Sequence, residues 1–244
     1  MNVRRTLAAE YATAPAYGLL RCRTFPEPML RAKRAAGVGC SAVAERPSIP
    51  VHTAEPGDVA AVSACLASAF YEDPVWGRWT FPDTSSRAQG LLGLMRFWVS
   101  GAVRHSWVQA TAAAEAAAVW LPPGQPEMTP EEERELEAFL SATLGERASE
   151  ILALFEQFDD YHPRQEPHYY LSLWGTHRTH AGRGLGTALM RENLARIDAE
   201  RMPAYLESTN PRNIRRYEAL GFRRRDEFGA AGGPVITTMW REAR

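Results

Sequence analysis

The sequence has very little lysine, and this shortage excludes two classes of enzyme at once. Only one of its 28 basic residues is a lysine, Lys33. A phosphate-binding P-loop needs a lysine directly after a glycine, and no Gly–Lys pair occurs in the chain. P-loop nucleotide hydrolases are therefore excluded. A Schiff-base mechanism is disfavoured as well, because Lys33 lies in a segment without the periodicity of a folded element.

Cysteines, long apolar runs and excess charge are also scarce. Three cysteines, Cys22, Cys40 and Cys65, form neither a disulfide framework nor a zinc-site spacing, so we expect no metal and a reducing cytoplasmic location. No window of 18 uninterrupted apolar residues occurs, so no membrane partner is expected. A net charge of −1 argues against a nucleic-acid partner. With 45% hydrophobic residues, the chain can still bury one sizeable core.

The beginning of the chain differs from the remainder in charge and pattern. The first fifty residues hold eight basic and three acidic side chains, so they carry +5 and leave −6 to the remainder. They are rich in Ala, Arg and Pro and lack both a sustained period and the apolar core of a signal peptide. We expect residues 1–49 to be a disordered basic extension and residues 50–244 to be the functional domain. A basic arm for an acidic partner stays open as the alternative.

Apolar periodicity in the remainder predicts alternating strands and helices. Strands are expected at residues 49–53, 106–112, 115–121, 168–176, 204–208 and 235–240. Helices are expected at 59–70, 85–105, 129–145, 148–158, 184–200 and 211–220, with a break after residue 72. This order predicts a single mixed α/β domain.

A glycine-rich loop joins the expected strand 168–176 to the expected helix 184–200. Its glycines at positions 182, 184 and 186 let backbone N–H groups converge at a helix N-terminus, which suits a phosphate or pyrophosphate. An ordinary glycine-rich turn is the alternative. The dinucleotide pattern G-x-G-x-x-G/A fails, because the sixth positions are Thr187 and Leu189. A methyltransferase loop fits on spacing, although such loops usually lie near the start of their domain.

A second motif follows the strand at 204–208 and consists of Asn210, Tyr217, Gly221 and Phe222. Together with the loop, it resembles the GCN5-related N-acetyltransferase (GNAT) superfamily. The superfamily's pyrophosphate loop reads Q/R-x-x-G-x-G/A, and its next motif runs from an Asn to a Tyr seven residues later and then to Gly-Phe. The resemblance covers about residues 50–242 and departs at Ala181, where the superfamily has Gln or Arg. That change removes a side-chain contact but keeps the backbone amides.

Within the superfamily, the chain looks most similar to puromycin N-acetyltransferases. The residues behind this narrower likeness are Glu166-Pro-His-Tyr-Tyr-Leu, Leu206-Glu-Ser and Pro211-Arg-Asn. The likeness does not fix the substrate.

The resemblance implies a GNAT fold, in which helices flank a central, mostly antiparallel sheet with one splayed strand pair. It also implies transfer of an acetyl group from acetyl-CoA, the co-substrate, to the amine of a small molecule, by direct attack in a ternary complex and without a metal. Backbone groups would hold pantetheine, acetyl and pyrophosphate, and two asparagines would contact the cofactor arm. The implied cofactor residues are Leu173, Trp174, Gly175, Thr176, Ala181, Gly182, Arg183, Gly184, Leu185, Gly186, Thr187, Asn210 and Asn213.

Two side chains are implied as catalytic groups. Tyr217 matches the residue that protonates the departing thiolate, with a core tyrosine as the alternative. Glu207 is our first choice for the general base, and His162 and His168 are further candidates whose alternative is a structural or solvated role. For Asn210 and Asn213, capping of the following helix is the alternative.

Aromatic residues between positions 70 and 81 either line an acceptor pocket or belong to the core. The set is Phe70, Tyr71, Trp76, Trp79 and Phe81.

Two other functions compete with the acetyltransferase. One is a non-catalytic acyl-CoA-binding or sensor module on the same fold, and the other is an S-adenosylmethionine-dependent methyltransferase. The expected partner is a small-molecule amine, and a homodimer stays open.

Overall fold

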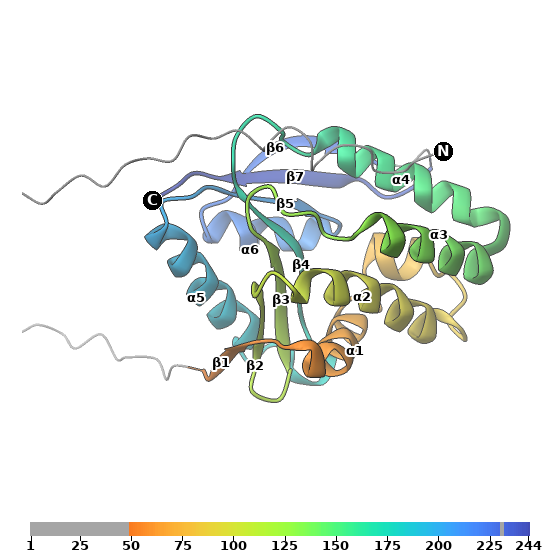
Figure 1. Cartoon of the computed structure of the whole chain (residues 1–244), viewed down its shortest axis with the longest axis horizontal. Helices are drawn as coiled ribbons and strands as arrows, with labels where there is room; N and C mark the ends of the chain where they lie inside the picture. The colour runs from red at the N-terminus through yellow and green to blue at the C-terminus, as the bar shows by residue number, and fades with distance from the viewer. Residues whose placement is uncertain (1–48, 230–231) are drawn as a thin grey trace, which may run out of the picture.

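A seven-stranded sheet organises the molecule, with strand order β1-β2-β3-β4-β5-β7-β6 (Figure 1). The computed structural model describes residues 49–229 and 232–244, so the expected extension lies outside the described residues except for its last residue. The strands are β1 (Val51–Thr53), β2 (Val108–Thr111), β3 (Ala116–Leu121), β4 (Tyr169–Thr176), β5 (Ala204–Ser208), β6 (Arg223–Phe228) and β7 (Ile236–Arg241). The described strands pair antiparallel except β4 and β5, which run parallel.

Helices cover both faces of the sheet (Figure 1). The α-helices are α1 (Val59–Ala69), α2 (Arg87–Val103), α3 (Pro130–Leu144), α4 (Ala148–Tyr161), α5 (Leu185–Ala199) and α6 (Ile214–Ala219). Short helical turns lie at η1 (Pro56–Asp58), η2 (Pro74–Trp79), η3 (Gly145–Arg147), η4 (Arg178–His180) and η5 (Pro211–Asn213). The expected mixed α/β fold with a mostly antiparallel sheet is confirmed.

Two hydrophobic cores form, one on each face of the sheet. On the face covered by α1–α4, buried side chains include Leu66, Leu94, Val119, Leu140 and Ile151. On the face covered by α5 and α6, they include Trp120, Leu189, Leu206, Ile214 and Phe222. Each fully buried aliphatic side chain of this size contributes about 1.5–3 kcal/mol. Strand β4 lies between the two cores, so side chains on both of its faces pack against helices.

Three features of the fold differ from the sequence expectation. Strand β6 was not expected at all, and the sheet has seven strands instead of six. The expected break after residue 72 is a π-helical turn, η2. The expected helix at 211–220 is divided into η5 and the shorter α6. Within the part of the chain that the structure describes, no helix is both long enough and apolar enough for a membrane crossing.

Candidate active site

Strands β4 and β5 separate part-way along their length. They pair only between residues 169–171 and 204–206, ending at Leu171 opposite Leu206. Beyond that point β4 continues to Thr176 and β5 to Ser208. A strand without a neighbour exposes a row of backbone N–H and C=O groups. The structure therefore contains the splayed strand pair that the resemblance implies.

A β-bulge lies on β4 where the separation begins. Val119 of β3 pairs with Leu173, whereas Trp120 pairs with Leu171, so Ser172 is the extra residue. A bulge of this kind re-aims the side chains that follow it. Leu173 accordingly packs into the core on the α1–α4 face, and Trp174 packs on the α5 face.

The loop that follows β4 forms a turn that only glycines adopt easily. Gly182 and Gly184 both have φ of +81°, and the space that a Cβ would enter at either position is empty within 4 Å. Gly184 precedes α5 without any side-chain cap, so the first backbone N–H groups of that helix have no intrahelical partner. A Cβ on Gly186 would lie 2.5 Å from the Thr176 hydroxyl. Glycine there lets α5 begin directly against β4, and the turn fits a pyrophosphate.

We call the cavity beside this turn the α5 groove; its volume is about 580 Å³. Eleven of the thirteen implied cofactor residues line it. They are Trp174, Gly175, Thr176, Ala181, Gly182, Gly184, Leu185, Gly186, Thr187, Asn210 and Asn213. Two are elsewhere: the side chain of Leu173 is in the core, and Arg183 approaches His180, with Nη1 3.5 Å from Nδ1.

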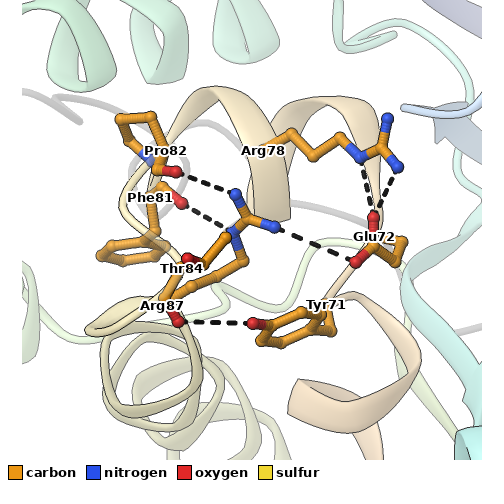
Figure 2. Close-up of polar contacts among 7 residues, drawn as sticks. All are labelled: Tyr71, Glu72, Arg78, Phe81, Pro82, Thr84 and Arg87. Atoms are coloured by element: carbon orange, nitrogen blue, oxygen red, sulfur yellow. Dashed lines mark hydrogen bonds and ion pairs between the residues drawn. The ribbon is translucent and has the colours of Figure 1, made fainter.

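A further wall of the groove comes from residues 69–78, and Figure 2 shows how Glu72 and Arg78 of this wall lie beside Arg87. Arg78 and Glu72 line the groove and form an ion pair at 2.5 Å, which holds the pKa of the Glu72 carboxyl below its ordinary value. The buried Arg87 donates hydrogen bonds to the carbonyl oxygens of Phe81 and Pro82. These contacts fix the wall against α2.

Asp73 connects this wall to the loop after β5. Its Oδ1 accepts hydrogen bonds from the backbone N–H groups of Val75 and Trp76, both at 3.0 Å. Its Oδ2 accepts a hydrogen bond of 2.8 Å from the Thr209 hydroxyl. Burial raises the pKa of Asp73. Asp73 therefore joins two sides of the α5 groove through one buried carboxyl group.

Tyr217 of α6 lies behind Trp174. The two ring centroids are 5.5 Å apart, and Trp174 donates a hydrogen bond from Nε1 to the carbonyl oxygen of Gly186. Burial, followed by the negative charge of Asp73, raises the pKa of Tyr217 well above its ordinary value. The hydroxyl consequently stays protonated at neutral pH, which a proton donor requires.

The two asparagines differ in what their side chains already do. Oδ1 of Asn210 accepts a hydrogen bond of 3.0 Å from the N–H of Arg212, so this side chain caps η5. Asn213 makes no side-chain cap to α6. Both line the groove, but the capping alternative applies only to Asn210.

A family model matches the site just described. The acetyltransferase (GNAT) family covers residues 104–222, which include β4, the glycine turn and Tyr217. These residues form a GNAT acetyltransferase domain. Its class is therefore that of the acyltransferases, and the family expected from the sequence is confirmed; the narrower likeness to puromycin N-acetyltransferases stays a prediction.

Solved structures of other GNAT proteins share the fold. An HPA2-type histone acetyltransferase-related protein from Corynebacterium glutamicum is 22% identical, with a TM-score of 0.56, over 81% of this chain and 98% of its own. Arylalkylamine N-acetyltransferase 2 from Aedes aegypti is 14% identical, with a TM-score of 0.57, over 81% and 100%. A polyamine N-acetyltransferase from Drosophila melanogaster is 17% identical, with a TM-score of 0.54, over 80% and 99%. At these identities the likeness concerns the fold.

This GNAT protein has a second cavity on the α1–α4 face of the sheet, which we call the histidine cavity. Its volume is about 80 Å³, and His162, His168 and Tyr170 line it. Glu207 lies beside it with a side chain that is 2% exposed, and its Oε1 is 3.9 Å from Nδ1 of His162. That buried oxygen has no hydrogen-bond partner in the structure. The candidate bases thus form one cluster, away from the glycine turn.

The aromatic segment before α2 divides between core and groove. Trp76 packs against Trp98 and Phe155 with centroids 5.0 and 5.8 Å away, and Phe81 is buried. The core alternative therefore holds for these two residues, whereas Phe70 lines the α5 groove.

The sequence does not predict one polar contact of β4. The Ser172 hydroxyl donates a hydrogen bond to Glu127, which lines the histidine cavity. Nothing in the local pattern marks Glu127, because it lies in a proline-rich loop, and only the bulge on β4 brings Ser172 to it.

Proposed function

We propose that this GNAT protein transfers the acetyl group of acetyl-CoA to the amine of a small molecule, by direct attack within a ternary complex. The observation that carries the proposal is the separation of β4 from β5 directly beside the glycine turn of α5. Eleven implied cofactor residues line the groove that results. Structural neighbours named as arylalkylamine and polyamine N-acetyltransferases support an amine as the acceptor.

The groove supplies two kinds of contact for the co-substrate. The unpaired edge of β4 from residue 172 to Thr176 offers backbone N–H and C=O groups to an extended pantetheine arm, as a neighbouring strand would. A backbone N–H at this edge also polarises the thioester carbonyl, and such a donor is worth about 10²–10³ in rate. The N-terminus of α5, with Gly182 and Gly184, holds the pyrophosphate through its partnerless N–H groups.

Tyr217 and Glu207 take the two proton-transfer roles. Tyr217 donates a proton to the CoA sulfur as the thioester bond breaks. Glu207 stands directly after Leu206, the last residue of β5 that pairs with β4, so its carboxylate lies where the two strands part. It receives the acceptor ammonium and removes the proton that must leave before the nitrogen attacks. General acid and base help of this kind contributes about 10²–10⁴ each.

The test combines binding with turnover. Calorimetric titration with acetyl-CoA and detection of released thiol with agmatine, tryptamine and puromycin would examine both halves of the proposal. Gly184→Ala places a side chain at a φ of +81°, and Gly57→Ala, at a glycine outside the groove with an empty surrounding, is the matched control. We expect Gly184→Ala to weaken acetyl-CoA binding about tenfold, since strain of about 1–2 kcal/mol enters the turn, and Gly57→Ala to leave it unchanged.

Three outcomes would redirect the proposal. Binding of acetyl-CoA without thiol release from any amine would favour the non-catalytic acyl-CoA-binding module. Stabilisation by S-adenosylmethionine and not by acetyl-CoA would favour the methyltransferase. Equal acetyl-CoA affinity of Gly184→Ala and Gly57→Ala would mean that the glycine turn does not bind acetyl-CoA.

A further inference from the structure

A chain of close contacts runs from Glu207 along two histidines to a backbone carbonyl. Oε1 of Glu207 is 3.9 Å from Nδ1 of His162. Nε2 of His162 is 3.1 Å from Nε2 of His168, and Nδ1 of His168 is 2.7 Å from the carbonyl oxygen of Glu166. The members come from β5, the end of α4 and the segment before β4, so the fold and not the sequence brings them together.

The contact between His168 and the carbonyl oxygen of Glu166 determines which histidine nitrogens carry protons. A carbonyl oxygen only accepts hydrogen bonds, so Nδ1 of His168 must carry the proton. Burial lowers the pKa of His168 to about 4, so the ring is neutral at pH 7 and its Nε2 is an acceptor. The proton between the two rings therefore belongs to Nε2 of His162. In neutral His162, Nδ1 is then left with its lone pair, directed toward Glu207.

The atom that this lone pair faces is unusual. Among the described residues, the buried Oε1 of Glu207 has no hydrogen-bond partner, whereas most buried polar atoms in proteins are paired. Its distance of 3.9 Å from Nδ1 of His162 is longer than a hydrogen bond. A proton on Nδ1 would place a donor on the side of His162 that faces this oxygen, and a small approach of the two side chains would then pair both atoms.

We propose that His168 is a positioning residue that fixes the tautomer of His162, and that Glu207 and His162 together take up the proton released by the acceptor ammonium. This inference rests on the proposed function. The N–H bond of the ammonium breaks, Glu207 accepts the proton, and the proton passes to Nδ1 of His162, which becomes an imidazolium beside the Glu207 carboxylate. Water in the histidine cavity then removes it. The second proton lost by the nitrogen after attack is balanced by the one that Tyr217 gives to the CoA sulfur.

Other charged and titratable groups surround this relay and set its pH range. The negative charge of Glu207 acts on Tyr170 of β4 and on Tyr205 of β5, whose hydroxyl donates a hydrogen bond to the carbonyl oxygen of Tyr161, and Asp226 of β6 adds to the charges that act on Tyr205. The positive charge of Arg225 on β6 lowers the pKa of His168 further. Both tyrosines have pKa values raised first by burial, so they stay neutral at pH 7.

Two substitutions of His168 separate positioning from packing. In His168→Gln the amide oxygen can still accept from Nε2 of His162, whereas His168→Leu fills the same space between Tyr205 and Trp240 without an acceptor. We expect His168→Gln to keep most of the turnover. His168→Leu should lower kcat about tenfold or more, move the acidic limb of the kcat/KM profile and leave the KM for acetyl-CoA unchanged. His52→Gln, on β1, is the control.

A spectroscopic readout decides the matter without activity. Nitrogen-15 spectra of the wild-type histidine rings should show His162 with a protonated Nε2 and a bare Nδ1 near pH 7, and His168 with a protonated Nδ1. The opposite tautomer of His162, or a His168→Leu enzyme with wild-type kcat and pH profile, would overturn the relay. If His168→Leu does not fold, the wild-type spectra still decide. A protein that fails to bind acetyl-CoA refutes the proposed function instead, whatever tautomer its histidines show.

Discussion

The α5 groove lies at the end of β4 and the histidine cavity lies at its start, and the two are built from different parts of the polypeptide. Part of the groove offers backbone groups: glycines with left-handed φ, the N–H groups at the start of α5 and an unpaired strand edge. These groups come from one continuous stretch, residues 174–187, while the remaining lining comes from residues 69–78 and 210–216. The histidine cavity consists of side chains from β3, α4, β4 and the loops next to them. Its titratable lining residues are Glu127 and several side chains between residues 159 and 170.

Under the proposed function, this difference corresponds to a division of tasks along β4. The groove would bind the CoA portion of the donor, and the cavity would handle the acceptor amine and its proton. Substitutions in the groove should then change affinity for acetyl-CoA, and substitutions near the cavity should change rates or pH dependence.

The largest effect should come from Tyr217→Phe. Removal of the hydroxyl deletes the proton donor for the CoA sulfur, which should lower kcat by about 10²–10⁴. The ring contact with Trp174 is retained, so acetyl-CoA affinity measured by calorimetry should stay within error of the wild type. Unchanged turnover would make Tyr217 a core tyrosine, and a parallel loss of affinity would place its hydroxyl in cofactor binding.

A smaller effect concerns the pH dependence of stability on the cavity side. The folded pKa of His168 is about 4, against an ordinary value of 6.5. Between these values the unfolded chain binds a proton that the folded protein does not, so this residue's contribution is present above pH 6.5 and is lost as the pH falls to 4. The loss amounts to about 3 kcal/mol at most.

Urea unfolding at pH 7.5 and pH 4.5 measures that loss. His168→Gln cannot titrate, so the difference in unfolding free energy between the two pH values should shrink relative to the wild type; the half-exposed His52→Gln is the control. An identical difference in wild type and His168→Gln would mean that His168 is not held neutral by burial.

Most of the fold was predictable because its elements carry apolar periodicity. The glycine turn and Tyr217 were predictable for a related reason, since their residues are close in sequence and their chemistry depends on spacing. Glu127 and Ser172 were not, because their contact depends on a one-residue bulge in β4. The sequence marks Glu207, His162 and His168 as candidate bases but does not predict that they contact one another in the order Glu207–His162–His168, because they come from β5, the end of α4 and the segment before β4.

Strand β6 was missed for a different physical reason. Its sequence, RRRDEF, is almost entirely charged, and five of its six residues are exposed. It lies at the edge of the sheet and pairs only with β7. Charged side chains protect an edge strand from pairing with other chains. Because these side chains replace the alternating apolar residues of an ordinary strand, the sequence pattern does not predict β6.

The smallest predicted effect concerns two residues of the α5 groove, Asn210 and Asn213, whose substitution should change different properties. The Asn210 side chain is already engaged as the cap of η5, so Asn210→Ala should lower the unfolding free energy by about 1 kcal/mol. Asn213 makes no such cap, so Asn213→Ala should leave stability unchanged and weaken acetyl-CoA binding by the worth of one hydrogen bond, about 1 kcal/mol or fivefold. Thermal unfolding and calorimetric titration of both variants check the pair. If Asn210→Ala lost affinity and Asn213→Ala did not, the cap residue would be the ligand, and the groove would rely on a side chain where we expect mainly backbone.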